Sequence, residues 1–543
     1  MKHLYILIFS NVLFIISINA QASFFKTVST TSETNRTVSP GIEFNGYHYF
    51  TAATSTYLMR TTLWKTNGTA TETIDFIDNE DDIYSAQAMF VFNNELYYLI
   101  NELGISKILK TDGTTSVTFL EATNESPYLA IENRTMAVLN TNFIFSHGSQ
   151  ATGYELYISD GTPNNHTMVK DINPGSNSSA PIYFSKIANN KVVFIANDGS
   201  NGKEIWVTDG TTTGTNLVKD INPNGNASIN GLTSFNGKAY FQLGNDIWET
   251  DGTEEGTIIF LNLRGHDNSE TPFHIYKDHM YFTAYDASFN KVDLWKTDGT
   301  TAGSTILVSN LNYADVFKGT NDILFFAAQD DTHGYELWRT DGTVSGTHLT
   351  RDIVPGIEDG LLSNLSENDL GNGGDQLYFQ AVYYDDDGNT DPDLHRELWT
   401  SDGTTTGTVL HTTINQTSTG SYPESFFNIN DKLLFKADVT PEGNFSNQGL
   451  NLWSVDTNLL SVLEQENISN KLKVYPNPSS NSIAISNKDN INEVVIFSMD
   501  GREIKTINSN FGYISIHDLS SGTYLLSVKL KDGKHSTLKF LKQ

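Results

Sequence analysis

Hydrophobic and polar residues alternate along the chain in short runs that recur about every 45 residues. One unit, GLTSFNGKAYFQLGNDIWETDGTEEGTIIFLNL, starts at Gly231 and shows the pattern most clearly. Asn236-Gly237 and Asp251-Gly252 separate its runs and supply the positive φ angles of tight hairpin turns. No window keeps a helical periodicity over the roughly 10–12 residues that a helix needs. Four short strands are predicted, around Thr233, at Ala239–Leu243, at Asp246–Glu249 and at Thr257–Leu263.

A glycine in the motif [TS]-[DN]-G-T measures the repeat. It occurs at Gly68, Gly113, Gly161, Gly210, Gly252, Gly299, Gly342 and Gly403. The spacings are 45, 48, 49, 42, 47, 43 and 61 residues, and a degenerate ninth copy, LNLWSVDTN, ends near Asp456. Such periods are typical of propeller blades and of some helical arrays, and four strands per unit favour the propeller. We expect an all-β fold with a β-propeller of eight or nine four-stranded blades.

The tryptophans share one place in the repeat, on the third predicted strand. All seven are found there: Trp64, Trp206, Trp248, Trp295, Trp338, Trp399 and Trp453. Leu109 and Tyr157 fill this place in the other two copies. A large flat side chain used only there is expected to wedge between neighbouring blades. The following Asp-Gly-Thr is interpreted as a turn, in which the Asp side chain accepts from nearby backbone N–H groups, and not as a catalytic motif.

The two ends of the repeat region predict how the ring closes. The ninth unit supplies SFFNI, KLLFKAD and LNLWSV, which are three strands, and then enters a polar stretch. SFFKTVST, which starts at Ser23, occupies the place that GTNLVKDI fills in another unit. We expect Phe24–Thr30 to complete the last blade and so to remove an open sheet edge.

Composition and the N-terminus place the chain outside the cytoplasm. Lys2, the apolar run Leu4–Ile18 and Ala20 form a predicted signal peptide over residues 1–20. The alternative is an uncleaved anchor, although the run is short for a spanning helix, and no other stretch is long enough to span a membrane. The chain has no cysteine, and residues 21–470 carry 23 basic against 58 acidic side chains. Such an acidic body is expected to repel nucleic acid and to attract divalent cations or neutral glycans.

Two motifs resemble known families. ELWRTDGTVSGTHLTRDIVPG, which starts at Glu336, resembles the ELWxxDGT repeat of secreted bacterial proteins. The resemblance covers about residues 40–457 of the predicted propeller, which spans residues 21–457. After a linker at residues 458–470, residues 471–543 predict a small β-sandwich and resemble the type A sorting domain of type IX secretion. The residues that carry the second resemblance are Tyr475, Pro476, Asn477, Pro478, Gly522, Tyr524 and Lys542.

The second resemblance implies a Bacteroidetes-type organism, passage through the type IX secretion machinery and removal of the tail. The protein would then be secreted or would stay at the outer-membrane surface. An ordinary C-terminal module is the alternative interpretation.

The longest departure from the repeat suggests a binding site. The eighth unit carries VYYDDDGNTDPDLHRELW between its second and third strands. Carboxylates from this insertion are the ligand type that calcium prefers, and the candidate ligands are Asp385, Asp387, Asp391 and Asp393. A solvated acidic loop is the alternative, and the spacing does not match an EF-hand. Tyr383 and Tyr384 are candidates to stack on a sugar ring.

Other chemistry is weaker in the sequence. His274 and His279 flank a tight turn but match no zinc motif, and no P-loop, G-x-S-x-G or dinucleotide motif is found. Calcium is the one candidate cofactor. We therefore expect a non-catalytic surface protein that binds glycans or proteins, with a glycan-active hydrolase or lyase as the alternative and a structural spacer as the third.

Overall fold

The computed structural model describes residues 22–28, 38–39, 41–53, 61–76, 83–102, 105–121, 136–244, 246–265, 272–286, 290–362, 365–384, 394–414, 420–437, 451–457, 474–475, 479–486, 488, 491–498, 503–531 and 535–543. The chain divides into two compact units, Gln21–Thr457 and Asn458–Gln543. The expected signal peptide and linker lie outside the described residues. Apart from β-strands, the described part of the first unit contains two short 3₁₀ turns, η1 (Ala188–Asn190) and η2 (Glu367–Asp369).

The first unit contains nine antiparallel sheets in its described residues, one for each sequence repeat. Blade 1 consists of β2 (Ile42–Phe44), β3 (Tyr47–Ala53), β4 (Thr61–Thr66) and β5 (Ile74–Asp75). Blade 2 consists of β6 (Ile83–Phe92), β7 (Glu95–Glu102), β8 (Ile105–Thr111) and β9 (Ser116–Glu121). Blade 3 consists of β10 (Met136–Leu139), β11 (Asn142–Ser149), β12 (Gly153–Ser159) and β13 (His166–Lys170).

The next three blades keep the same strand order. Blade 4 consists of β14 (Ile182–Ile187), β15 (Lys191–Asn197), β16 (Lys203–Thr208) and β17 (Asn216–Lys219). Blade 5 consists of β18 (Ile229–Phe235), β19 (Lys238–Leu243), β20 (Asp246–Thr250) and β21 (Ile258–Leu261). Blade 6 has two short first-strand pieces, β22 (Arg264–Gly265) and β23 (His274–Tyr276), then β24 (His279–Tyr285), β25 (Val292–Thr297) and β26 (Thr305–Leu311).

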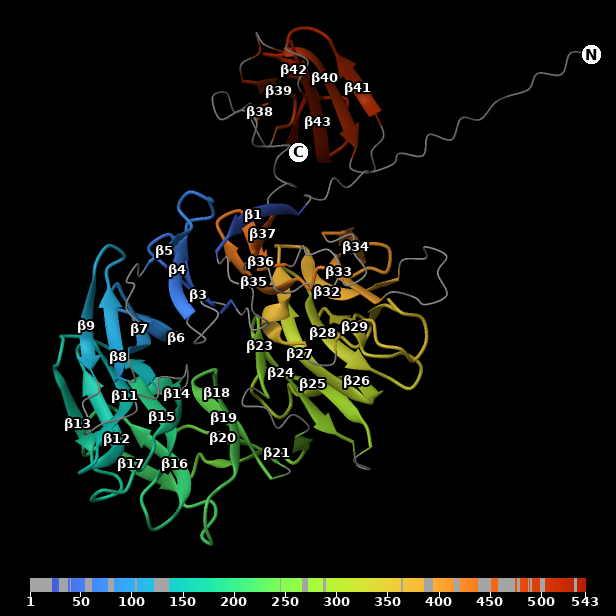
Figure 1. The fold of residues 1–543 in the computed structure, drawn as a ribbon. Coiled ribbons are helices and arrows are strands. Elements are labelled where there is room, and N and C mark those ends of the chain that lie inside the picture. Colours follow the sequence, from blue (N-terminus) through green and yellow to red (C-terminus); the bar gives the residue numbers. More distant parts are fainter. Residues whose placement is uncertain are drawn as a thin grey trace, which may run out of the picture. The chain divides into compact units, whose positions relative to one another are not determined.

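The last three blades complete the unit. Blade 7 consists of β27 (Tyr313–Gly319), β28 (Leu324–Gln329), β29 (Glu336–Thr340) and β30 (His348–Arg351). Blade 8 consists of β31 (Leu370–Asn372), β32 (Leu377–Tyr384), β33 (Leu394–Ser401) and β34 (Val409–Thr412). Blade 9 consists of β35 (Glu424–Ile429), β36 (Lys432–Lys436), β37 (Asn451–Asp456) and the N-terminal β1 (Ser23–Thr27). The sheets follow one another around a ring, with the first strand of each toward the middle (Figure 1). The predicted propeller is confirmed, with nine blades.

The ring closes through the N-terminal strand, as the sequence predicts. β1 pairs antiparallel with β37, so that Phe24 lies opposite Trp453. The strand spans Ser23–Thr27, so it starts one residue and ends three residues earlier than the expected Phe24–Thr30. The ammonium group of Lys26 donates to the backbone carbonyl of Thr73 in blade 1. Lys219 makes the equivalent contact from blade 4 to Thr257 of blade 5, at 2.9 Å. The last blade therefore contacts the first in the same way as blades that are consecutive in the sequence.

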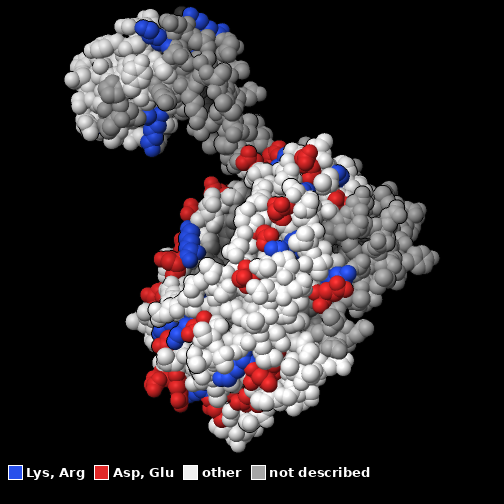
Figure 2. All heavy atoms as spheres, turned by 90° about the vertical axis from the view of Figure 1, so that its left-hand side faces the viewer, with Lys and Arg blue, Asp and Glu red and all other residues white. Residues whose placement is uncertain are grey.

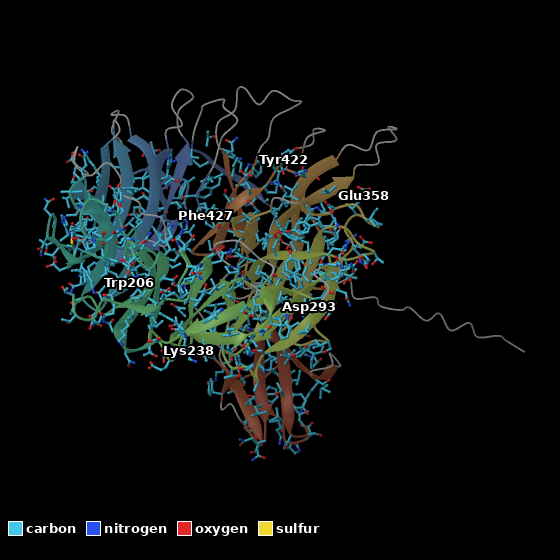
Figure 3. All side chains as sticks on the ribbon, turned by 90° about the horizontal axis from the view of Figure 1, so that it is seen from below. Trp206, Lys238, Asp293, Glu358, Tyr422 and Phe427 are labelled. Atoms are coloured by element: carbon cyan, nitrogen blue, oxygen red, sulfur yellow. The ribbon has the colours of Figure 1, made fainter. Side chains whose placement is uncertain are left out.

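Tryptophan side chains pack between neighbouring blades, which confirms the predicted wedge for Trp206 (labelled in Figure 3), Trp338 and Trp399. Trp338 of blade 7 is 7 % exposed and packs with Leu294 and Leu307 of blade 6. Trp206 packs in the same way against Leu156 of the preceding blade. The contacts between blades are therefore mainly apolar.

The Asp-Gly-Thr motif forms the predicted turn. In blade 4, Oδ1 of Asp209 accepts from the backbone N–H of Thr211 at 2.9 Å and from its hydroxyl group at 2.7 Å. These hydrogen bonds hold the pKa of the Asp209 carboxyl below its usual range. The glycines of all eight motifs have φ between +84° and +98°, a region that favours glycine. A Cβ on Gly214, the second glycine of the turn, would lie 2.0 Å from the Asp209 carboxylate, so a side chain there would force the Asp209 side chain to shift.

The glutamate two residues before the tryptophan has a structural role that the sequence analysis missed. Glu336 is fully buried, and its carboxylate accepts from the backbone N–H groups of Ile353 and Val354, both at 3.2 Å. Burial raises the pKa of Glu336 to about 8. Glu204 holds the corresponding loop of blade 4 through Ile221 at 2.9 Å. Glu155 and Glu397 make the same kind of contact, so buried glutamates fix the connections that follow blades 3, 4, 7 and 8.

The second unit is a small β-sandwich, as expected. One sheet has the order β38 (Val474–Tyr475), β39 (Ser482–Ile485), β42 (Ile514–Ser515). The other has the order β41 (Glu503–Ile507), β40 (Ile491–Ser498), β43 (Gly522–Leu530), β44 (His535–Lys542). Ile483 and Ile514 from the first sheet share one buried core with Ile496, Leu526 and Phe540 from the second.

Candidate functional site

The connections between strands sort onto two faces of the ring. The turns between first and second strands contact the turns between third and fourth strands of the next blade. Asn236 Nδ2 donates to the carbonyl oxygen of Asp298 at 2.9 Å, and Asn430 Nδ2 donates to that of Asn67 at 2.8 Å. We call this the turn face. The remaining connections, which vary in sequence, form the opposite variable-loop face. Because these turn-face side chains form hydrogen bonds within the scaffold, ligand-binding residues are expected on the variable-loop face.

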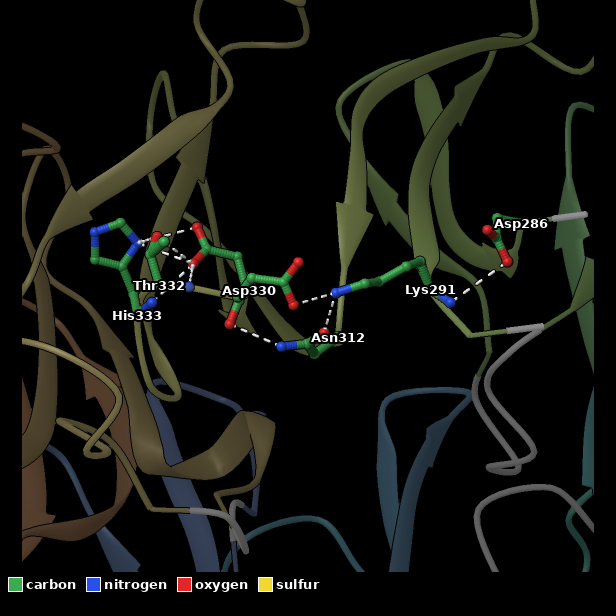
Figure 4. Close-up of polar contacts among 7 residues, drawn as sticks. Asp286, Lys291, Asn312, Asp330, Thr332 and His333 are labelled. Atoms are coloured by element: carbon green, nitrogen blue, oxygen red, sulfur yellow. Dashed lines mark hydrogen bonds and ion pairs between the residues drawn. The ribbon is translucent and has the colours of Figure 1, made fainter. Parts of the chain in front are cut away.

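A lysine bridges blades 6 and 7 on the variable-loop face (Figure 4). Lys291 lies at the start of β25, and its ammonium group contacts the side chains of Asn312 and Asp331. Asn312 Nδ2 donates to the carbonyl oxygen of Asp330 at 2.7 Å. The second-to-third connection of blade 7 is thus held against blade 6.

The same loop of blade 7 contains a histidine–carboxylate pair. His333 Nδ1 lies 3.0 Å from both carboxylate oxygens of Asp330, and the N–H of Thr332 donates to Oδ1 of Asp330 at 2.7 Å. Partial burial acts to raise the pKa of Asp330, but the hydrogen bonds from His333 and Thr332 outweigh it and lower that pKa to about 2. Asp330 therefore carries a negative charge at neutral pH, beside the exposed carboxylate of Asp331.

Two tyrosines lie beside this loop. Tyr313 begins β27, is 41 % exposed, and has its ring centroid 6.1 Å from that of Tyr335. The Tyr335 hydroxyl donates to the Asp315 carboxylate, and its backbone N–H donates to Asp359 Oδ1 at 2.7 Å. Burial and the Asp315 charge raise the pKa of Tyr335, which keeps this phenol neutral. Tyr313 is thus partly exposed to solvent and packs against Tyr335, which is itself held by hydrogen bonds.

The sequence-predicted candidates belong to the next blade on the same face. Tyr383 and Tyr384 end β32, the strand that corresponds to β28 before the Asp330 loop, and their backbones pair with His395 and Leu394. Asp385, Asp387, Asp391 and Asp393 lie outside the described residues. Nearby, the guanidinium group of Arg396 lies 5.6 Å from the ring centre of Tyr422.

The structure separates the two histidines of the weaker zinc hypothesis. His274 stacks on Phe317 of the next blade with ring centroids 5.6 Å apart, whereas His279 Nδ1 lies 2.7 Å from its neighbour Asp278. In the part of the chain that the structure describes, no group of three His, Cys, Asp or Glu residues is arranged to hold a metal ion. No helix within that part is long and apolar enough to cross a membrane.

Electrostatics of the propeller agree with an acidic surface. In the view of Figure 2, acidic side chains are spread over the visible face, with lysine and arginine side chains among them.

The network around Lys291 on the variable-loop face could not be predicted from the sequence, because Asn312 and Asp331 lie 21 and 40 residues from Lys291. The only available signal was that polar residues gather in the second-to-third connections of successive units.

Three of the predicted sorting residues, Gly522, Tyr524 and Lys542, lie on the paired strands β43 and β44. Lys542 lies opposite Gly522 in the β43–β44 pair and forms a parallel bridge with Ser479. The Tyr524 ring stacks on Phe540 with centroids 5.5 Å apart, and Tyr475 is 53 % exposed. Pro476, Asn477 and Pro478 lie outside the described residues.

Comparisons with known proteins identify the tail. A family model described as the secretion system C-terminal sorting domain matches residues 473–543. No curated protein matches the chain. The type IX secretion resemblance of the tail is therefore confirmed, whereas the ELWxxDGT resemblance stays a prediction from sequence.

Solved structures resemble the chain only distantly. PorZ, a bacterial surface component of the type IX secretion system of Porphyromonas gingivalis, is 13 % identical over 92 % of this chain and 74 % of its own, with a TM-score of 0.28. The β-propeller domain of the Trilobed protease from Pyrococcus furiosus, which has an open velcro topology, is 14 % identical over 56 % of this chain and 96 % of its own, with a TM-score of 0.32. Oligopeptidase B from Leishmania major is 7 % identical over 68 % and 53 %, with a TM-score of 0.37. At these scores neither an activity nor a ligand passes to this chain.

Proposed function

We propose that the chain is a cell-surface or released binding protein, and that its propeller holds the ligand on the variable-loop face of blades 6–8. The observation that carries this proposal is the difference between the two faces. On the turn face, Asp and Asn side chains make hydrogen bonds within and between blades. On the opposite face, Tyr313 is 41 % exposed, and its neighbour Asn312 is hydrogen-bonded to the loop that carries the Asp330 and Asp331 carboxylates.

The chemistry of this surface suits a neutral glycan. An aromatic ring offers an apolar face with little conformational entropy to lose, and carboxylates accept hydrogen bonds from hydroxyl groups. Since Lys291 is engaged by Asp331 and Asn312, the surface keeps negative charge, which disfavours nucleic acids and other polyanions. Tyr383 and Tyr384 of blade 8 stay candidates from the sequence to stack on a sugar ring.

The C-terminal sorting domain supports export of the protein. The C-terminal sorting domain makes this a protein of type IX secretion and directs it to the outside of the cell. Attachment to surface lipopolysaccharide, or release after removal of the tail, belongs to the proposal. Deletion of residues 471–543 in the native host should leave the protein inside the cell; its continued appearance in the medium would refute the sorting role.

A glycan array probed with residues 21–543 tests binding directly. Tyr313→Ala should reduce the signal on any bound glycan by about tenfold, because aromatic contacts commonly carry binding energy of this size. Val344→Ala is a matched control: this side chain is 63 % exposed on the turn face of the same blade, and its removal should change nothing. Equal loss in both variants, or no loss in either, would contradict the proposed face.

A hydrolase or lyase is the second candidate, favoured by one observation. His333 and Asp330 form the type of pair that general acid–base catalysis uses. Turnover of a polysaccharide by purified residues 21–543, abolished in His333→Gln, would establish the enzyme and replace the binding proposal. If the protein binds no glycan on the array and turns over no polysaccharide, a structural spacer would be favoured.

A further inference from the structure

Blade 3 departs from the other blades around its wedge position. Tyr157 stands there in place of tryptophan and pairs with Phe145 on β11 and with Met168 on β13. Two residues beyond Phe145 is His147, and two residues before Met168 is His166. Both histidines therefore lie on the same face of the sheet as Tyr157, next to it on the two neighbouring strands.

Most other blades carry small residues at these two positions; the exceptions are Ile100 in blade 2 and Leu243 in blade 5. The strand register gives the equivalents of His147 as Ala52, Ile100, Ala196, Leu243, Ala284, Ala328, Ala381 and Ala437. It gives the equivalents of His166 as Thr73, Ser116, Thr215, Thr257, Ser304, Thr347, Thr408 and Ala22. Most blades thus fold with alanine at the first position and threonine or serine at the second. A histidine at both positions of one blade is not required by the fold.

The two imidazole rings lie next to each other in an edge-to-face arrangement. Their centroids lie 5.0 Å apart and their planes cross at 83°. His147 is 9 % exposed, and the Nδ1 atoms of both rings are buried without a hydrogen-bond partner among the described residues. A buried polar nitrogen atom without a partner costs free energy unless a further group binds it, and here each of two neighbouring rings carries one.

The separation matches two ligands of one metal ion. An imidazole nitrogen binds zinc at about 2.0–2.1 Å, which places the ring centroid roughly 3.2 Å from the metal. Two such rings at a tetrahedral angle would have centroids roughly 5 Å apart, close to the observed 5.0 Å. Burial lowers the pKa of His147 to about 4 and also lowers that of His166, so both rings are neutral at pH 7. Neutral imidazole is the form that binds metals.

We propose that His147 and His166 form a site for a divalent transition metal of the zinc, nickel or copper class in blade 3. Imidazole pairs favour these ions over calcium and magnesium, which prefer oxygen ligands. Because no third His, Asp or Glu joins the pair among the described residues, the remaining coordination positions are taken by water or by an added ligand. The site lies apart from the variable-loop face of blades 6–8 and does not depend on the ligand proposed there.

The competing explanation is that the two rings only fill space. Tyrosine is smaller than tryptophan, and two histidines in place of alanine and threonine restore the lost volume. On this explanation metal ions would not stabilise the blade, and the substitutions would act through packing alone.

Titration of residues 21–543 with zinc, nickel and copper tests the site. The protein is purified without a polyhistidine tag, treated with a chelator, and studied by isothermal calorimetry and thermal melting. We expect one tight equivalent per chain and a melting temperature that rises with metal concentration. His147→Ala and His166→Thr, which install residues that other blades already carry, should each weaken binding at least about tenfold.

Two controls make every outcome informative. Circular dichroism and metal-free melting of the variants establish that blade 3 still folds. His279→Ala removes a partly exposed histidine of blade 6 and should leave the metal affinity unchanged. Binding that is absent from wild type, or that survives the double substitution unchanged, would overturn the metal site; a loss of metal-free stability alone would support space filling.

Discussion

Trp338→Ala is the sharpest test of how the blades hold together. The side chain is 7 % exposed and lies against Leu294 and Leu307 of blade 6 and Phe326 of its own blade. A buried tryptophan removes about 150–250 Å² from water, which corresponds to roughly 4–6 kcal/mol at about 25 cal/mol per Å². Alanine keeps part of this and the unfolded chain is partly compact, so we expect a loss of about 3–5 kcal/mol, the usual range for such truncations.

The indole group makes this substitution easy to interpret. Its Nε1 has no hydrogen-bond partner among the described residues, so alanine leaves no protein acceptor without a donor. The loss is therefore apolar packing alone. Unfolding in urea, followed by fluorescence and circular dichroism, measures it. Val344→Ala, an exposed change in the same blade, should stay within about 0.5 kcal/mol of wild type. A loss below about 1 kcal/mol in Trp338→Ala would refute the wedge.

Three further predictions concern closure, turns and buried charge. Deletion of residues 23–30 should lower the melting temperature by several degrees, because β37 would then have an open edge; an unchanged melt would contradict the closure. Gly210→Ala should cost about 1–2 kcal/mol, because φ is +89° there; thermal melting without a loss would show that the turn tolerates a side chain. Since the pKa of Glu336 is raised to about 8, the folded state holds more protons than the unfolded state between about pH 4.5 and 8, and the free energy of unfolding falls as pH rises through this window. Urea melts at pH 5 and 8 should show wild type losing stability relative to Glu336→Gln, and a constant difference would exclude the shift.

Repeated local chemistry could be predicted from the sequence. Nine copies of one unit showed the four strands, the place of Trp338 and the turn at Asp209-Gly210, because each depends on residues that are close in sequence. Closure by β1 could also be predicted, since Phe24 fits the pattern of a missing fourth strand.

Contacts between distant residues could not be predicted in the same way. Glu336 binds backbone groups 17 and 18 residues ahead, so its role needed the geometry, although the recurring glutamate before the tryptophan was a signal in the sequence. The Lys291 network joins loops of two blades, and no recurring sequence pattern corresponds to it. His147 and His166 become conspicuous only after the strand register aligns them with alanine and threonine elsewhere.

A disulfide engineered between β1 and β37 tests the closed nine-bladed ring most directly. Ser23 and Ser454 are paired across these strands, with their hydroxyl oxygens 3.3 Å apart, and the natural chain contains no cysteine that could interfere. The account predicts that Ser23→Cys combined with Ser454→Cys forms an intramolecular disulfide on mild oxidation and raises the melting temperature, because the bond constrains the unfolded chain. Free thiols that persist under oxidation, or a disulfide that forms only between molecules, would show that the N-terminal strand is not part of the last blade.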